Sequence, residues 1–322
     1  MDLLGILLLI CLCAGGLVLA ISYICFFMAF FVPKHMPPAD DDYSIPKGKI
    51  YEPYRDEMVA WMKEVRAMPH EDMTVTSFDG LKLFGRFYEY APGAPIELMF
   101  HGYRGLADRD LCGGVQRCFK LGHSALIVDQ RACGRSGGQI ITFGVNEKKD
   151  CFSWLAFMQQ RFGPDVKILL TGISMGASTV LMAAGEELPA NVVGVLADCG
   201  YSSAKEIIKK VIRQMHLPDG LLYPFVKLGA RLYGNFDLEE TPPVEAVKKC
   251  KIPVIFFHGD TDDFVPCEMS KRNYEACASR KKLVTVPGAG HGLSLLLDRD
   301  GYFSSMKSFF GPELSNTKDP LP

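Results

Sequence analysis

The sequence contains no excess of basic side chains and no stripe rich in lysine and arginine. Its 322 residues include 35 Lys and Arg and 37 Asp and Glu, which gives a formal net charge of −2 at pH 7. Proteins that bind nucleic acid through the phosphate backbone carry a basic patch. The composition therefore predicts no nucleic-acid partner.

Zinc-binding spacings and internal repeats are also absent. The sequence has no H-E-x-x-H and no paired C-x-x-C motif, which are common arrangements of zinc ligands. No segment repeats along the chain, which argues against a solenoid. We therefore expect no metal site. A content of 48% hydrophobic and 22% charged residues indicates an ordinary globular protein, once a membrane segment is allowed for.

Charge is missing altogether from residues 3–33, LLGILLLICLCAGGLVLAISYICFFMAFFVP. At about 1.5 Å per residue, a helix of this length exceeds the roughly 30 Å hydrocarbon core of a bilayer. We predict a single transmembrane anchor over residues 1–33. The alternative is a cleaved signal peptide, but the start MDLL has no positive charge, the apolar run is too long, and no small-residue cleavage motif follows.

The flanks of this run bear on its orientation. Basic residues occur only on the C-terminal side, at Lys34, Lys47, Lys49 and Arg55. Such residues tend to stay in the cytoplasm. The side of the membrane stays open, and the charge distribution favours a cytoplasmic catalytic domain.

Eleven cysteines leave the disulfide state open. Three lie in the apolar run, at Cys11, Cys13 and Cys25, and eight follow it, at Cys112, Cys118, Cys133, Cys151, Cys199, Cys250, Cys267 and Cys277. Several fall in predicted helices or strands, as buried free thiols do. An even number is equally compatible with four disulfides.

After residue 70, short apolar strands alternate with helices. The stretches 73–78 and 81–90, separated by Asp79-Gly80, predict an antiparallel hairpin. Further strands are expected at 96–100, 124–129, 166–170, 192–198, 253–257 and 282–286, and helices at about 108–121, 146–162, from 175, 268–280 and 302–310. This alternation is typical of a parallel sheet covered by helices on both faces. We predict an α/β fold with an eight-stranded, mostly parallel sheet.

Four segments divide the chain in this interpretation. They are the anchor at 1–33, a linker and packing helix at 34–69, a catalytic domain at 70–313, and a flexible tail at 314–322. A helical insertion at about 201–249 stands where a lid would lie. Its apolar residues, which we expect either to pack on the domain or to contact lipid, also suit the roof of an apolar pocket. They are Leu221, Leu222, Phe225, Val226, Leu228, Leu232 and Tyr233.

A serine between two glycines is the first candidate for catalysis. The run VKILL leads into Gly172-Ile173-Ser174-Met175-Gly176. The spacing G-x-S-x-G allows a tight turn from strand to helix that holds the serine hydroxyl out at the end of the strand. Ser174 is therefore the expected nucleophile.

A base and an acid follow Ser174 in the chain, each just after a predicted strand. His291 lies among glycines in GAGHG and can take the serine proton at neutral pH. The acid is expected among Asp260, Asp262 and Asp263 of HGDTDDFVP. We choose Asp262 to orient the histidine, with Asp260 as the alternative. His101 and His258, each in a His-Gly pair at a strand end, are expected to shape their loops.

Acyl transfer also needs donors for an oxyanion, and backbone N–H groups can provide them without reorganising. We predict the N–H of Met175, at the start of the helix after Ser174, and that of Tyr103 in HGYRG.

These motifs together resemble the α/β-hydrolase superfamily. GISMG, HGYRG, HGDTDDFVP and GAGHG, in the order Ser, Asp, His, carry the resemblance over about residues 70–311. The stretch DQRACGRSGG is similar to a loop of the serine-aminopeptidase-like, or hydrolase-4 type, branch, which includes membrane-anchored members. The resemblance implies an eight-stranded sheet with the second strand antiparallel, and the roles assigned above to Ser174, Asp262, His291, Tyr103 and Met175.

One position departs from the branch pattern, because Cys133 stands where many relatives carry histidine. Asp129, Arg131 and Arg135 of the same loop are expected to form structural ion pairs.

The expected function is a membrane-anchored serine hydrolase that cleaves carboxylic esters of small molecules or acyl lipids without a cofactor. An amidase or peptidase with the same triad, and a non-catalytic scaffold of the same fold, are the alternatives. The oligomeric state is left open.

Overall fold

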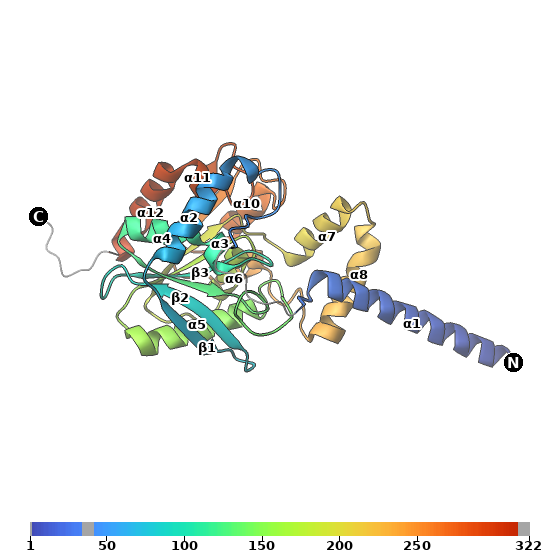
Figure 1. Ribbon diagram of the computed structural model, residues 1–322. Coiled ribbons are helices and arrows are strands. Elements are labelled where there is room, and N and C mark those ends of the chain that lie inside the picture. The colour runs from blue at the N-terminus through green and yellow to red at the C-terminus, as the bar shows by residue number, and fades with distance from the viewer. Residues whose placement is uncertain (1, 34–41, 315–322) are drawn as a thin grey trace, which may run out of the picture.

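A computed structural model of the chain describes residues 2–33 and 42–314. Its centre is one eight-stranded sheet in the order β1-β2-β4-β3-β5-β6-β7-β8 (Figure 1). β2 is antiparallel to β1 and β4, and the other pairs are parallel. The predicted α/β class, strand number and antiparallel second strand are therefore confirmed. The strands are β1 (Glu71–Thr76), β2 (Lys82–Tyr88), β3 (Ile96–Phe100), β4 (Ser124–Asp129), β5 (Ile168–Ile173), β6 (Val192–Asp198), β7 (Val254–Gly259) and β8 (Lys281–Val286).

Helices cover both faces of this sheet because its central strands are apolar on both sides. Every residue of β3, β4 and β7 is buried. One face packs against α5 (Glu147–Phe162), α6 (Met175–Ala184) and α10 (Cys267–Ala276), and the other against α2 (Arg55–Ala67), α4 (Cys112–Leu121) and α12 (Arg299–Leu314). The remaining short elements are η1 (Glu52–Tyr54), α3 (Ala107–Asp110), α9 (Pro243–Ala246), η2 (Val247–Lys249) and α11 (Ser294–Leu297).

The helix expected at about 108–121 is two helices in the structure. α3 ends at Asp110, and Leu111, with φ −111° and ψ 3°, leaves the helical conformation before α4 begins at Cys112. Tertiary contacts hold the two parts in different directions. The N–H of Ala107, at the start of α3, donates to the buried Asp129 side chain, whereas Gly113 of α4 lies against the ring of Trp61 of α2.

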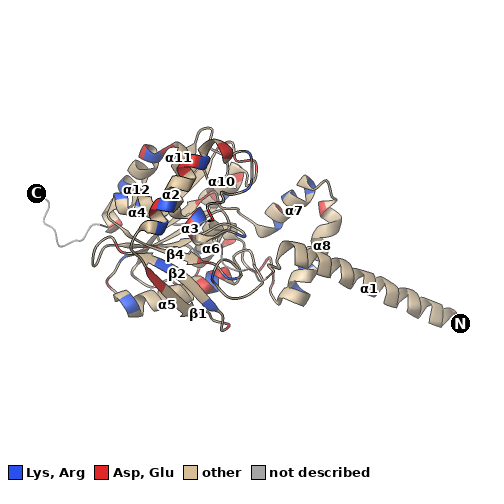
Figure 2. Cartoon of the chain, viewed as in Figure 1, with Lys and Arg blue, Asp and Glu red and all other residues tan. Residues whose placement is uncertain are grey.

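The N-terminal helix α1 (Leu3–Ala29) extends away from the sheet and lies beside the insertion, which forms α7 (Ala204–Gln214) and α8 (Asp219–Gly234) (Figure 1). Figure 2 shows that α1 carries no charged side chain along its length. The other domain boundaries remain predictions. Linker residues 34–41 and tail residues 315–322 lie outside the described residues.

All eleven cysteines fall within the described residues, and none forms a disulfide. Seven of them are buried, among them Cys118 and Cys151, which have no exposed surface. The structure thus has the arrangement expected of buried free thiols.

A buried network of charged side chains connects the central strands β3 and β5 with α4. Glu97 of β3 has no exposed surface and accepts hydrogen bonds from Arg117 and from Thr171 Oγ1 (3.0 Å), and it pairs with His123 Nδ1 (2.9 Å). Burial alone raises the pKa of Glu97, but the positive charge of Arg117 and the bond from His123 outweigh it and lower the pKa to about 2.

We expect Glu97→Gln to lower the free energy of unfolding by about 3–5 kcal/mol at neutral pH, because Arg117 loses its buried counter-charge. The pKa of Glu97 in the folded protein is about 2, below about 4.3 in the unfolded chain. Its contribution is therefore complete above that higher value and is lost as the pH falls toward the lower one. Urea unfolding in detergent micelles at pH 7 and at a pH between these two pKa values measures both effects. The exposed Glu187→Gln is the control, and equal stabilities of the two variants would contradict the prediction.

Candidate active site

Ser174 occupies the turn between β5 and α6 in a strained conformation. Its φ is 56° and its ψ is −117°, in the left-handed half of backbone space that side chains rarely adopt. Close contacts explain the two glycines. A Cβ on Gly172 would lie 2.2 Å from the carbonyl of Gly176, and one on Gly176 would lie 2.0 Å from the carbonyl oxygen of Phe100. The turn can therefore form only with glycine at both positions.

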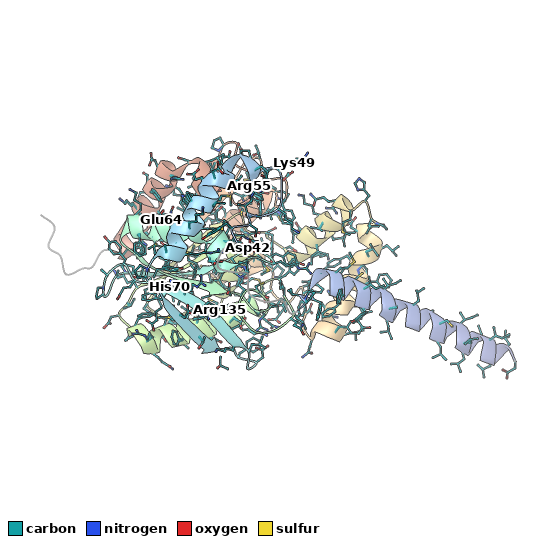
Figure 3. All side chains as sticks on the ribbon, viewed as in Figure 1. Asp42, Lys49, Arg55, Glu64, His70 and Arg135 are labelled. Atoms are coloured by element: carbon teal, nitrogen blue, oxygen red, sulfur yellow. The ribbon has the colours of Figure 1, made fainter. Side chains whose placement is uncertain are left out.

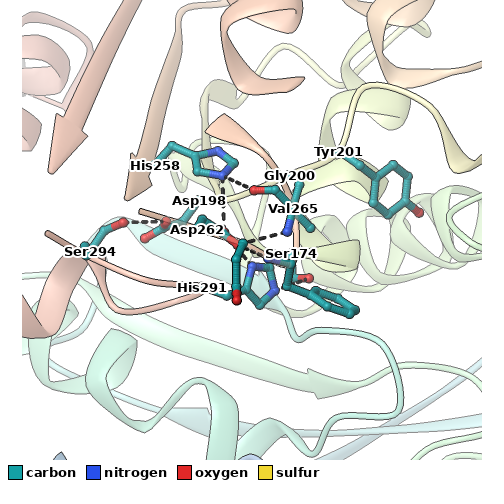
Figure 4. A network of polar contacts seen from close by, with 12 residues as sticks. Ser174, Asp198, Gly200, Tyr201, His258, Asp262, Val265, His291 and Ser294 are labelled. Atoms are coloured by element: carbon teal, nitrogen blue, oxygen red, sulfur yellow. Dashed lines mark hydrogen bonds and ion pairs between the residues drawn. The ribbon is translucent and has the colours of Figure 1, made fainter. Parts of the chain in front are cut away.

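The structure brings Ser174, His291 and Asp262 into one series of hydrogen bonds (Figure 4). Asp262 Oδ2 lies 2.7 Å from His291 Nδ1, and Ser174 Oγ lies 2.9 Å from Nε2. A carboxylate can only accept, so Nδ1 carries the ring proton and Nε2 accepts from the serine hydroxyl. This arrangement leaves His291 able to remove the serine proton.

Asp262 is held as a charged group. Its Oδ1 accepts from the N–H groups of Phe264 and Val265, each at 2.9 Å, and its Oδ2 lies 3.2 Å from His258 Nε2. Burial raises the pKa of Asp262, but hydrogen bonds from His258 and His291 outweigh burial and hold the pKa well below its usual range. The carboxylate is thus ionised at neutral pH, as an orienting acid requires.

The alternative acids lie elsewhere. Asp260 Oδ1 accepts from the N–H of Gly288 (2.7 Å), which fixes the loop before His291. The carbonyl of Asp263 accepts from Lys210 of α7. Among the described residues, Asp262 is the aspartate whose side chain contacts His291.

The two predicted oxyanion donors lie on either side of Ser174. Met175 begins α6, and the loop that contains Tyr103 passes close by, because a Cβ on Gly102 would lie 3.9 Å from Ser174 Oγ. His101 sets the shape of this loop: its Nδ1 contacts the carbonyl oxygen of Gly102 (2.7 Å), and its Nε2 accepts from the N–H of Gln130 (3.0 Å). The N–H groups of Tyr103 and Met175 find no acceptor within the described part of the chain.

Two supporting residues were missed from the sequence. Tyr51, in the segment predicted to be a linker, donates its hydroxyl to the carbonyl oxygen of His291 (3.0 Å), and burial raises its pKa so that it stays a donor. No local motif could have found it. Asp198 ends β6, and its carbonyl oxygen accepts from the N–H of Ser174 (2.8 Å). Its position at a strand end was a signal that the sequence interpretation did not use.

A cavity of about 230 Å³ extends from Ser174 and His291 into the domain. The sequence predicted that the insertion at 201–249 roofs this pocket. Among the described residues, however, no side chain of the insertion lines the cavity. The segment after the anchor supplies the wall instead, through Pro46, Tyr51, Met58 and Trp61. Figure 3 shows this segment between the labelled Asp42 and Glu64. Arg66 of α2 donates to the carbonyl oxygen of Asp42 (2.7 Å) within the segment, and its pair with Asp108 (2.9 Å) holds the segment to the domain.

Three side chains at this site could also be considered as metal ligands. One donor atom each from Cys199, Asp262 and His291 lies within 4.8 Å of the others. Metals bind the thiolate, however, and burial raises the pKa of Cys199 well above its usual range. Asp262 and His291 are already joined to each other. The chemistry of these residues therefore fits the hydrogen-bonded series better than a metal site.

In the loop around Cys133, the two arginines form the expected ion pairs, whereas among the described residues the carboxylate of Asp129 accepts from backbone N–H groups instead. Arg131 pairs with Asp150 (2.7 Å) and Asp79 (3.0 Å), and Arg135 with Asp72 (2.8 Å). Asp129 accepts from the N–H groups of Ala107 and Arg135. Cys133 is buried in the apolar cluster beside α6.

Comparison with known proteins agrees with this fold. No family model matches the chain. The uncharacterized protein YqkD of Bacillus subtilis is 29% identical over 190 residues, which cover 59% of this chain and 62% of YqkD. The esterase Pf2001 of Pyrococcus furiosus has a TM-score of 0.64 and 20% identity, over 88% of this chain and all of that chain. The alpha/beta hydrolase GrgF from Penicillium has a TM-score of 0.61 and 18% identity, over 77% of this chain and 99% of GrgF.

These structural similarities cover most of the chain, including its eight-stranded, mostly parallel sheet. The chain therefore has the α/β-hydrolase fold.

Proposed function

We propose that the protein is a membrane-anchored serine hydrolase that cleaves carboxylic esters. The observation that carries this proposal is the series from Asp262 through His291 to Ser174, with distances of 2.7 and 2.9 Å. Its three members come from loops after β7, β8 and β5, so local sequence alone does not bring them together. A scaffold without catalysis has no need for this geometry.

The chemistry takes two steps. His291 Nε2 removes the proton from Ser174 Oγ, which bonds to the ester carbonyl carbon while the carbonyl electrons move to oxygen. The N–H groups of Tyr103 and Met175 stabilise that anion. The C–O bond to the alcohol then breaks, and the alcohol leaves with the proton from His291. Water, deprotonated by the same histidine, releases the acid and restores Ser174.

Anchoring by α1 rests on its composition and its exposure. The helix has 27 residues, and its most apolar 18-residue window has a mean hydropathy of 2.9 and is not buried within the chain. A long apolar helix that exposes most of its surface needs lipid around it. A signal sequence has the same features, and the mature N-terminus of the purified protein distinguishes the two.

Esters are favoured over amides by the similarity to Pf2001, which is described as an esterase. The cavity of about 230 Å³ is smaller than the roughly 300–1,000 Å³ of sites that enclose a whole ligand. It therefore suits one part of the ester, and we expect turnover to favour short acyl chains.

The test is covalent labelling of the full chain in detergent by a fluorophosphonate probe. We expect one adduct, on the peptide that contains Ser174, and no adduct in Ser174→Ala. A folded protein that does not react would favour the scaffold. Turnover of p-nitrophenyl esters of graded acyl length is then compared with that of aminoacyl amides, and a preference for the amides would replace the esterase with an amidase or peptidase.

A further inference from the structure

The insertion helix α8 packs with one side against α1 and leaves its other side uncovered. Tyr223, Val226 and Ala230 are buried in the cluster that contains Phe26 of α1 and Phe30 at its C-cap. On the uncovered side, Leu221 and Leu232 are 63% and 52% exposed. Both sides of this helix are therefore apolar, a property of helices that are enclosed by protein or lipid.

The contact between α8 and α1 is close and specific. A Cβ on Gly229 would lie 2.4 Å from the carbonyl oxygen of Ser22, so glycine lets the two backbones approach. The hydroxyl of Tyr233 donates to the carbonyl oxygen of Leu19 (3.1 Å), and its ring packs edge-on against Tyr23. Small residues at such crossings, with hydrogen bonds between helices, are typical of packing within membranes.

These contacts indicate that α8 lies near the boundary between the lipid headgroups and the hydrocarbon core. A hydrocarbon core of about 30 Å covers roughly 20 residues of helix, so one centred on Gly16 of α1 ends near Phe26. Ser22 and Leu19 then lie about 6 and 10 Å inside it at 1.5 Å per residue. Interfacial helices bury their apolar side to about 5–10 Å. α8 lies across the last turns of α1 (Figure 1) and thus runs near the plane of the bilayer that α1 would span.

Charged groups mark the water side of this boundary. Arg104 donates to the carbonyl oxygens of Met28 and Phe31 at the end of α1, both at 3.0 Å. Arg231 of α8 pairs with Asp237. Arginine with a long stem and a charged head suits the headgroup level.

We propose that α8 is a second membrane element, which inserts the stripe Leu221, Phe225, Leu228 and Leu232 among the acyl chains of the lipid leaflet next to the domain. These residues are spaced i, i+4, i+7 and i+11 and share one side of the helix. The occupant is lipid because α8 packs directly on α1, whose apolar surface is not covered by the rest of the described chain.

Insertion of α8 also orients the candidate active site. The hydroxyl of Tyr103, a residue that lines the cavity, donates to the carbonyl oxygen of Ala29 (2.7 Å) in the last turn of α1. The rim of the cavity is therefore tied to the point where the chain leaves the bilayer. An ester that resides in the membrane could reach Ser174 from there. This inference rests on the proposed anchoring by α1 and is independent of the proposed chemistry.

The test reconstitutes full-length protein with one added tryptophan into phosphatidylcholine vesicles. Part of the lipid carries a nitroxide, either near its ester linkage or near the middle of its acyl chain. Leu221→Trp and Leu232→Trp report on the stripe, and Leu17→Trp, at a position 62% exposed near the middle of α1, reports on the anchor. Tyr90→Trp, at a position 50% exposed near the opposite rim of the sheet, is the matched control. Emission of the parent protein, from Trp61 and Trp154, is subtracted.

We expect the added tryptophans at 221 and 232 to lose emission most strongly to the shallow nitroxide, and to be blue-shifted relative to the control. The tryptophan at position 17 should respond most to the deep nitroxide. Quenching at 221 and 232 that only equals the control, while position 17 is quenched, would overturn the insertion of α8 and leave the anchor standing. A stripe covered by a second copy of the chain gives that same result. Loss of quenching at all three sites overturns the anchor and the inference together, whereas labelling of Ser174 in the same vesicles reports separately on the chemistry.

Discussion

Ser174→Ala lowers kcat for ester hydrolysis by about 10⁶-fold, the loss typical when a triad nucleophile is removed. Without Oγ no acyl-enzyme forms, and only the oxyanion donors and substrate binding continue to assist the attack of water. His291→Ala gives a loss of similar size, and the double variant is no worse, because the two residues act as a unit. Initial rates with a short p-nitrophenyl ester, measured on each purified variant in detergent, check the three values.

Ser153→Ala is the matched control, since this serine lies on α5, where its hydroxyl contacts only the carbonyl oxygen of Lys149 among the described residues. It should leave kcat unchanged. Hydrolysis that persists in Ser174→Ala at the level of the parent protein, and that co-purifies with the folded variant, would contradict the proposed nucleophile.

Asp262→Asn lowers kcat by about 10⁴-fold, because an amide cannot hold the histidine tautomer that leaves Nε2 free to accept. The side chain keeps an oxygen for the N–H groups of Phe264 and Val265, so the loop has its present hydrogen bonds available. The loss should appear mainly in kcat and less in KM, since the carboxyl group does not line the cavity. Steady-state kinetics across a range of ester concentrations separate the two parameters.

Asp260→Asn tests the alternative that the sequence left open. Its carboxylate bonds to the N–H of Gly288 and has no contact with His291 within the described residues, so we expect a small effect on kcat. If Asp260→Asn and Asp262→Asn exchanged their effects, the assignment of the acid would be wrong.

The sheet was predictable because its signals are local. Each central strand is a short apolar run followed by a loop, and the hairpin of β1 and β2 turns at Asp79-Gly80, as its sequence indicates. The break between α3 and α4 was not predictable. The two helices have different partners far away in the chain: Asp129 of β4 binds the N–H of Ala107 at the start of α3, and Trp61 of α2 packs on Gly113 of α4. Helical periodicity carries no information about such partners.

The sequence was sufficient to predict which loops carry the candidate site and which types of residue they contribute. The glycines around Ser174 and His291 and the order of the motifs pointed to three residues, but HGDTDDFVP alone offered three aspartates. The choice among them depends on which carboxylate reaches His291, and this is set by the backbone amides of residues 264 and 265, which bind Asp262.

By itself the sequence determined the α/β class, the apolar N-terminal run and the segments that carry the candidate chemistry, because strand period, helix length and glycine spacing are properties of neighbours along the chain. Only the tertiary structure decided that the linker and the packing helix wall the cavity, through Tyr51 and Trp61, and that α8 packs on α1. These contacts join residues far apart in the chain. Each contact depends on the shapes of the two segments that meet and on which of their side chains become buried, and the sequence of one segment does not specify the other.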